Sequence, residues 1–238
     1  MKIALIGYGK MGKTIEKFAV ERNHEIVLKI SSSNIDEMTP EAIKKADVVI
    51  EFTQPHAALE NVSKVLNAGV PCVSGTTGWN DDFEKAYNLA KVNNTAILVS
   101  SNFSLGVNIF FEINKQLAKL MNAYPEYEVK VAETHHTQKK DAPSGTAITI
   151  TEQIMEGLNR KNKWELDTMS SAESIEIDAF RVENVPGTHV VNYSSPIDDI
   201  EIKHTAHNRD GFALGAVIAA EFLVGKQGIF SMKDVLFS

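Results

Sequence analysis

The residues best suited to chemistry lie in one segment, residues 133–147, which reads ETHHTQKKDAPSGTA. An imidazole such as that of His135 can donate or accept a proton near neutral pH. Lys139 follows four residues later and can hold a carboxylate or stabilise developing negative charge. Residues 143–146 are typical of the first turn of a helix, whose free backbone N–H groups attract an anion. The segment therefore predicts an acid–base group beside an anion pocket, which would suit a reductase acting on a small acidic substrate.

Structural roles for the same residues remain open at this point. On a regular strand His135 and His136 would point to opposite faces, so they need not share a role. Glu133 and Asp141 could complete a metal site, but the spacing matches no common ligand signature, and we predict no metal. Arg181 and Arg209 could bind an anion or form surface ion pairs. Structural or solvated roles are the preferred interpretation for four further residues: Lys140, His189, His204 and His207.

A second motif lies near the N-terminus. Residues 3–6 form an unbroken apolar run, typical of a parallel strand that is covered on both faces. A glycine-rich turn and a helical pattern follow, so the backbone can bend tightly and approach a pyrophosphate closely. A purely structural turn is the alternative. The predicted cofactor contacts in this turn are Gly7, Tyr8, Gly9, Lys10, Met11 and Gly12.

Further strands alternate with helices through the first hundred residues, which predicts a doubly wound parallel sheet. Ligands bind at the carboxyl ends of such strands. The strand ends at residues 52–53, 75–77 and 100–103 therefore outline one crevice together with the glycine-rich turn.

The end of the second strand bears on the choice of cofactor. An acidic residue at this position would accept a hydrogen bond from the ribose 2′-hydroxyl of NAD. The chain instead has Ser31-Ser-Ser-Asn34, with Asp36 further along. Because the Ser31 hydroxyl could serve a 2′-hydroxyl or a 2′-phosphate, NADH and NADPH both remain candidates.

The pattern changes in the second half of the chain. A strand at 128–133 leads into the histidine segment, and residues 161–165 are interpreted as polar and exposed. Three alternating runs then predict an antiparallel or mixed sheet with one exposed or partner-facing surface, at 175–182, 189–193 and 200–205. The apolar tail from residue 229 is expected to pack back on the nucleotide-binding domain.

These patterns predict an α/β protein with a Rossmann-type doubly wound parallel sheet and a second α+β domain with a mixed or antiparallel sheet. The expected dinucleotide-binding domain comprises residues 1–104 and 212–238. The expected substrate-binding and oligomerisation domain comprises residues 105–211.

Composition narrows the class of protein. A formal net charge of −7 disfavours a nucleic-acid-binding surface, which is normally basic. The single cysteine, Cys72, excludes an internal disulfide and fits a reducing compartment. No apolar run has the length of a membrane span, and the N-terminus enters a strand without a leader pattern. We therefore expect a cytoplasmic protein without nucleic-acid or membrane partners.

At residues 133–147 the chain resembles the dihydrodipicolinate reductase (4-hydroxy-tetrahydrodipicolinate reductase) family, whose signature is E-x-H-H-x-x-K-x-D-A-P-S-G-T-A. The resemblance extends over essentially the whole chain. It is also carried by Gly7–Gly12, Val49–Pro55, Gly75–Gly78, Ser101–Asn108 and Gly228–Leu236. The chain departs from the family pattern at Glu51, where Asp is usual, and after Arg181, where a glycine is usual.

The resemblance implies an NADH- or NADPH-dependent reduction of a cyclic imine dicarboxylate to tetrahydrodipicolinate, in lysine and diaminopimelate biosynthesis. It implies that His135 is the proton donor and Lys139 the accompanying cation. His136 and the backbone of Gly145 and Thr146 would hold the substrate carboxylates, and a homotetramer is expected. The residues implied on the nicotinamide side are Gly75, Thr76, Thr77, Ser100, Ser101, Asn102 and Phe103.

Two other functions are compatible with the residues alone. One is a nucleotide-binding sensor without turnover, and the other is a dehydrogenase of another small amino or imino acid.

Overall fold

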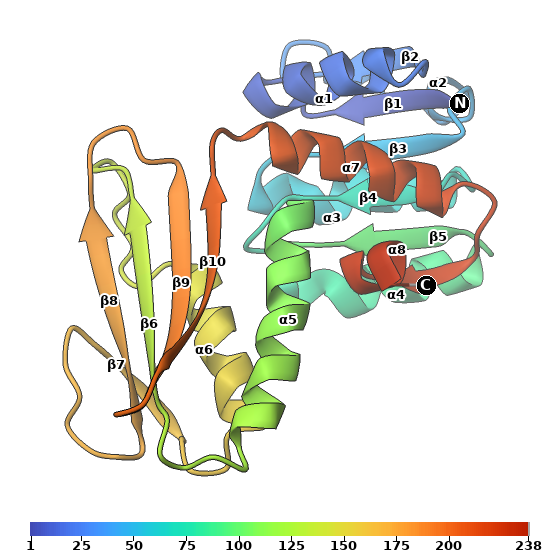
Figure 1. Cartoon of the computed structure of the whole chain (residues 1–238). Coiled ribbons are helices and arrows are strands. Elements are labelled where there is room, and N and C mark those ends of the chain that lie inside the picture. Colours follow the sequence, from blue (N-terminus) through green and yellow to red (C-terminus); the bar gives the residue numbers. More distant parts are fainter. Residues whose placement is uncertain (238) are drawn as a thin grey trace. The chain divides into compact units, whose positions relative to one another are not determined.

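The structure is a computed structural model that describes residues 1–237, and it divides into two compact units (Figure 1). Unit 1 contains Met1–Leu105 and the chain from Asp210 onward, and unit 2 contains Gly106–Arg209. Among the described residues, no helix is long and apolar enough to cross a membrane.

Unit 1 is built on a six-stranded sheet in which every strand pairs in parallel, in the order β11-β5-β4-β3-β1-β2. The strands are β1 (Lys2–Ile6), β2 (Glu25–Ile30), β3 (Val48–Glu51), β4 (Cys72–Ser74), β5 (Ala96–Val99) and β11 (Gly228–Phe230). The α-helices are α1 (Lys10–Glu21), α2 (Pro40–Ile43), α3 (Pro55–Asn67), α4 (Phe83–Val92), α7 (Asp210–Leu223) and α8 (Met232–Phe237). Short 3₁₀ helices occupy Ile35–Glu37 and Asn80–Asp82.

Helices cover both faces of this sheet, which explains why its central strands are mainly apolar. Ile3 and Leu5 of β1 pack with α1, α7 and α8, whereas Ala4 and Ile6 pack with α2, α3 and α4. The predicted doubly wound parallel sheet is thus confirmed. The apolar tail also packs as expected, because β11 pairs with β5 and places Gly228 opposite Ala96.

Unit 2 is built on a five-stranded mixed sheet in the order β10-β9-β6-β8-β7. Strand β6 pairs with β8 in parallel and with β9 in antiparallel orientation. One face carries the buried core, to which α5 and α6 contribute Phe110 and Ile154. The elements are α5 (Leu105–Met121), β6 (Glu128–His135), α6 (Gly145–Gly157), β7 (Lys163–Leu166), β8 (Ser174–Arg181), β9 (Gly187–Ser194) and β10 (Asp199–Ala206).

Two sequence interpretations of unit 2 need correction. Strand β6 extends to His135 rather than ending at Glu133, because its last residues continue the pairing with β8. The interpretation of residues 161–165 as an exposed polar segment holds for Asn162 and Lys163 only. Most of the segment forms β7, which pairs with β8, and the side chain of Lys161 is fully buried.

Candidate functional sites

A pocket of about 630 Å³ lies at the carboxyl end of the unit 1 sheet. Its walls include six predicted cofactor contacts: Gly7, Tyr8, Gly9, Lys10, Met11 and Ser31. The turn after β1 and the end of β2 are held together, since the N–H groups of Gly7 and Tyr8 both donate to the Ile30 carbonyl, at 2.9 and 2.8 Å. The helix α1 begins at this wall, so its N-terminus is available to a phosphate group.

Each glycine of this turn meets a different structural requirement. Gly7 has a φ of +96°, and a Cβ at this position would lie 1.9 Å from the Phe52 carbonyl oxygen. A Cβ at Gly12 would lie 2.6 Å from the Gly7 oxygen, so Gly12 serves close packing of the helix on the turn. At Gly9 a Cβ would meet nothing within 4 Å, which leaves that backbone open to a ligand. The pocket therefore fits a dinucleotide pyrophosphate.

A buried carboxylate organises the neighbouring strand ends. Glu51 ends β3 and accepts hydrogen bonds from Ser74 Oγ at 2.6 Å and Thr76 Oγ1 at 2.7 Å. It also accepts from the Thr53 hydroxyl and, at 3.0 Å, from the Thr53 N–H. The Thr76 side chain is thus committed to the protein's own network, although it was predicted as a cofactor contact. Its backbone carbonyl accepts from Trp79 Nε1 at 2.8 Å.

The other predicted nicotinamide-side residues lie at the ends of β4 and β5, which are adjacent strands. Phe103 is buried, and its ring contacts that of Phe52 with centroids 5.6 Å apart. A Cβ at Gly75 would come within 2.1 Å of the Phe52 ring, so Gly75 makes room for that ring. Thr77 and Ser101 are exposed. Ser100 Oγ accepts from the Asn102 N–H at 3.2 Å, and Asn102 Oδ1 accepts from the Ser104 N–H at 2.9 Å, so both shape the loop.

Several pocket residues were not predicted as contacts. They come mainly from the loop after β3 and the start of α3: Gln54, His56, Ala57, Glu60 and Asn61, with Ser32 and Ile35 after β2. Pro55 at the first position of α3 was the available signal, because it fixes a helix start directly after a strand end.

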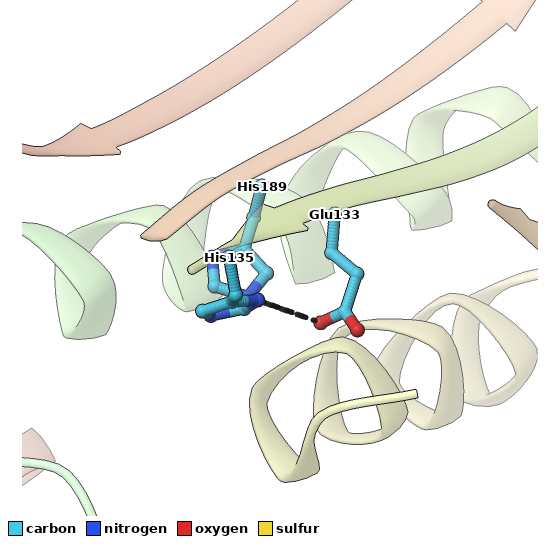
Figure 2. Close-up of side chains that lie close together, drawn as sticks. All are labelled: Glu133, His135 and His189. Carbon is cyan, nitrogen blue, oxygen red and sulfur yellow. Dashed lines mark ion pairs between the residues drawn. The ribbon is translucent and has the colours of Figure 1, made fainter. Parts of the chain in front are cut away.

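Unit 2 brings a carboxylate and two imidazoles together in a buried cluster (Figure 2). Glu133 Oε2 lies 3.4 Å from His135 Nδ1 and 3.8 Å from His189 Nε2. The two imidazole rings meet edge to face, with centroids 5.1 Å apart. His189 reaches this position because Glu133 on β6 is in register with His189 on β9. The sequence interpretation assigned His189 a structural role and did not pair it with His135.

The other oxygen of the same carboxylate has two donors. Glu133 Oε1 accepts from the Ser144 N–H at 3.0 Å and lies 3.3 Å from Arg181 Nη2. Arg181 also donates to the Lys139 carbonyl at 3.2 Å and to the Asp141 carbonyl. It therefore fixes the loop that carries Lys139, and it forms an ion pair with Glu133 while remaining partly exposed.

The predicted anion pocket lies at the start of α6. Ser144 caps the helix by accepting from the Ala147 N–H at 3.1 Å. Within residues 1–237, the N–H groups of Gly145 and Thr146 meet no protein acceptor. Lys139 Nζ contacts Asp141 at 2.8 Å, so an incoming carboxylate would compete with Asp141. His136 follows β6 directly and is partly buried.

Burial and neighbouring charges shift the titration of this cluster. Burial lowers the pKa of His135, Lys139 and Arg181 lower it further, and Glu133 and Asp141 oppose the shift. Burial lowers the pKa of His189 to about 3, with a contribution from His135. Lys139 lowers the pKa of Asp141 through their hydrogen-bonded contact. Because its pKa lies near 3, His189 stays neutral at physiological pH.

The cluster also has the composition of a cation site. Glu133, His135 and His189 each offer one ligand atom, and these atoms lie within 4.8 Å of one another. However, Arg181 already places a positive charge against the carboxylate, and that charge would repel a divalent ion. The absence of a metal stays a prediction.

The fold and the two sites define a class, the oxidoreductases with a Rossmann-type NAD(P)-binding domain and a second mixed-sheet domain. Within it, this chain belongs to the dihydrodipicolinate reductase family. Residues 1–103 match the family model described as "Dihydrodipicolinate reductase, N-terminus", and residues 106–236 match "Dihydrodipicolinate reductase, C-terminus".

Individual relatives agree with this membership. A protein of Christiangramia forsetii named 4-hydroxy-tetrahydrodipicolinate reductase is 50% identical over 99% of this chain and 98% of its own length. A protein of Methanoregula boonei with the same name is 39% identical over 82% of this chain and 76% of its own length. The solved structure of a dipicolinate-bound dihydrodipicolinate reductase from Paenisporosarcina sp. TG-14 has the same fold. Its TM-score is 0.78, at 24% identity over 97% of both chains.

Proposed function

We propose that this chain catalyses the NAD(P)H-dependent reduction of 4-hydroxy-tetrahydrodipicolinate (dihydrodipicolinate) to tetrahydrodipicolinate in lysine and diaminopimelate biosynthesis. Family membership and the 50% identical relative of that name support the reaction. The structural observation that carries the proposal is the site at the end of β6. There a buried imidazole, a lysine and a helix N-terminus with free N–H groups lie within one short segment, as an acidic substrate that must gain a proton requires.

The residues of unit 1 hold the cofactor. The turn at Gly7–Gly12 binds the pyrophosphate through backbone N–H groups and the start of α1. Glu51 and its hydroxyl partners keep the ends of β3 and β4 in place, which supports the nicotinamide side of the site. Bound NAD(P)H supplies the hydride.

The residues of unit 2 hold the substrate and supply the proton. Lys139, His136 and the N–H groups of Gly145 and Thr146 bind the two carboxylates. His135 donates the proton that balances the added hydride. Lys139 additionally offsets the negative charge that develops on the substrate.

The pocket wall after β2 supports the use of either cofactor. Ser31, Ser32 and Ile35 form it, and hydroxyl groups can donate to a phosphate or accept from a 2′-hydroxyl. A cytoplasmic location and assembly into a homotetramer are also part of the proposal. The buried thiol of Cys72 is compatible with a reducing compartment.

The test is NADH and NADPH oxidation with enzymatically generated substrate, comparing wild type with His135→Ala and Lys139→Ala. Loss of the proton donor should lower kcat by roughly 10²–10⁴-fold. Loss of the lysine removes a charge-assisted hydrogen bond, so kcat/KM should fall by roughly tenfold or more. The matched control is Lys140→Ala, since Lys140 is exposed and lies next to Lys139.

Each alternative has a distinct outcome in this assay. Tight NAD(P)H binding without turnover would favour a sensor, and turnover only with another amino or imino acid would favour a different dehydrogenase. Full activity of both alanine variants would contradict the assigned roles.

A further inference from the structure

The cluster around Glu133 contains a buried carboxylate that the proposed reaction does not itself use. Its side chain has no exposed surface, and Oε1 is occupied by Ser144 N–H and Arg181. Oε2 faces the two imidazoles (Figure 2). Glu133 Oε2 and His135 Nδ1 lie 3.4 Å apart as an ion pair, and within the described residues neither atom forms a hydrogen bond. Burying a carboxylate costs free energy unless the charge is paired and hydrogen-bonded.

His135 needs a counter-charge to work as an acid. Its ring is largely buried, and Lys139 from the following loop and Arg181 from β8 add positive charge nearby. These three influences all disfavour the imidazolium form. Against them stand Glu133 on the same strand and Asp141 in the loop, and Asp141 is engaged by Lys139. Glu133 is therefore the main group that allows a buried His135 to carry a proton.

The remaining neighbour, His189 of β9, does not compete for that role. Its Nε2 lies 3.4 Å from Ser144 Oγ and farther from Glu133 than His135 Nδ1 does. Burial keeps its pKa near 3, so it adds no positive charge near neutral pH. Its ring instead packs against the ring of His135 and limits that ring's rotation.

We propose that Glu133 is a positioning residue which holds the proton of His135 on Nδ1, fixes the ring and leaves Nε2 as the proton-donating atom. This inference rests on the proposed function, in which His135 is the acid. The space at Nε2 is consistent with this orientation, because a Cβ at Gly187 would lie 3.1 Å from Nε2 and the glycine keeps that side clear.

The same carboxylate also links the acid to the anion pocket. Its Oε1 accepts from the Ser144 N–H, and the two N–H groups that follow in α6 are those proposed to bind the substrate carboxylate. One side chain thus sets the position of the proton donor relative to the helix that holds the substrate. A small error in such a distance lowers the rate strongly.

The first experiment is the pH profile of kcat for wild type, Glu133→Gln and Glu133→Asp. The glutamine preserves the shape and removes the charge, so the His135 imidazolium loses its stabilisation and its pKa falls further. Since the protonated form is the active one, the alkaline limb of the profile should move to lower pH by about one unit or more. The kcat near neutral pH should fall roughly tenfold or more, with an unchanged KM for NAD(P)H. The aspartate variant should restore the limb toward that of wild type.

The matched control is Glu176→Gln, a carboxylate of β8 that pairs with Lys130 on β6. It should leave the pH profile unchanged. A Glu133→Gln enzyme with the wild-type profile, under conditions where His135→Ala is inactive, would overturn the inference and leave the proposed function intact. An active His135→Ala variant would instead remove the proposed role of His135, on which the inference depends.

A second measurement does not depend on the stability of any variant. The ¹⁵N chemical shifts of the His135 ring in the wild-type protein distinguish the two neutral tautomers. We expect the Nδ1-protonated form above the pKa of His135. A ring protonated on Nε2 instead would overturn the inference even if Glu133→Gln failed to fold.

Discussion

At the scale of single residues, Lys161 shows how unit 2 accommodates a buried charge. Its Nζ contacts Glu128 Oε2 at 2.7 Å and donates to the carbonyls of Ala172 and Ser174 at 2.8 and 3.1 Å. All three donor positions of the ammonium are therefore used. The Lys161→Met substitution keeps much of the apolar stem and removes these bonds. We expect it to lower the free energy of unfolding by about 1–3 kcal/mol, measured by urea denaturation.

The matched control is Lys163→Met, two residues further along the chain. The side chain of Lys163 is 46% exposed and pairs with Glu165 at 3.3 Å, so its removal should change stability by less than about 1 kcal/mol. Both variants should retain activity, because neither lysine belongs to the proposed sites. Equal stability of the two variants would contradict the structural role of Lys161.

At the scale of elements, Gly215 sets the distance between α7 and the loop after β5. A Cβ at Gly215 would lie 1.8 Å from the carbonyl oxygen of Phe103, which is backbone and cannot move aside like a flexible side chain. The Gly215→Ala substitution should therefore push α7 away from the loop and destabilise the protein by about 1–3 kcal/mol. This outcome opposes helix propensity, which favours Ala over Gly by about 1 kcal/mol. Thermal or urea unfolding would measure it.

The same helix provides the control for this prediction. A Cβ at Gly211 would meet Ser104 Oγ at 3.6 Å, an ordinary contact distance. Gly211→Ala should therefore be neutral or slightly stabilising. If both alanine variants proved equally stable, close packing at Gly215 would not determine the position of α7.

Elements whose pattern is local could be predicted from the sequence, and contacts between distant segments could not. The central strands β1, β3, β4 and β5 of unit 1 were predictable because they are buried and read as short, mainly apolar runs between turn residues. Strand β7 was missed because Lys163–Leu166 is short and partly polar, and only its pairing with β8 defines it. The burial of Lys161 depends on the carbonyls of Ala172 and Ser174, which no local pattern reveals.

In the candidate site, too, the features with a local sequence pattern were predictable and those that depend on strand pairing were not. His135 and Lys139 were identifiable from residue type and spacing, and the helix start from Pro143 and Ser144. The position of His189 depends on the register between β6 and β9. A shift of one residue would turn that imidazole to the other face of the sheet.

At the scale of the whole molecule, the net charge of −7 has the same sign as the charges of the cofactor and substrate proposed for it. Both the dinucleotide and the dicarboxylate are anions, so the average field of the protein does not attract them. Local groups must therefore supply the attraction: Lys10 and the start of α1 in unit 1, and Lys139 and the start of α6 in unit 2. Binding should consequently depend on these positions more than on surface charges elsewhere.

The assembly of whole molecules is the last feature to test. In the unit 2 sheet, Val131 and Val191 belong to the core shared with α5 and α6. Their neighbours Ala132 and Val190 must point to the opposite face, where β6 and β9 place them side by side. A homotetramer formed through this face would bury both. Sedimentation equilibrium should then give four times the chain mass of 26.2 kDa. The substitution Val190→Glu should give a smaller species, because an unpaired carboxylate would be buried at each contact.

The control for this last prediction is Val92→Glu, on α4 of unit 1. Val92 is 77% exposed and lies outside the unit 2 sheet, so a carboxylate there should leave an assembly through that sheet intact. A wild-type mass equal to one chain would contradict the homotetramer. If Val190→Glu remained tetrameric and Val92→Glu did not, the subunit contact would lie on unit 1 and not on the face of the unit 2 sheet that carries Val190.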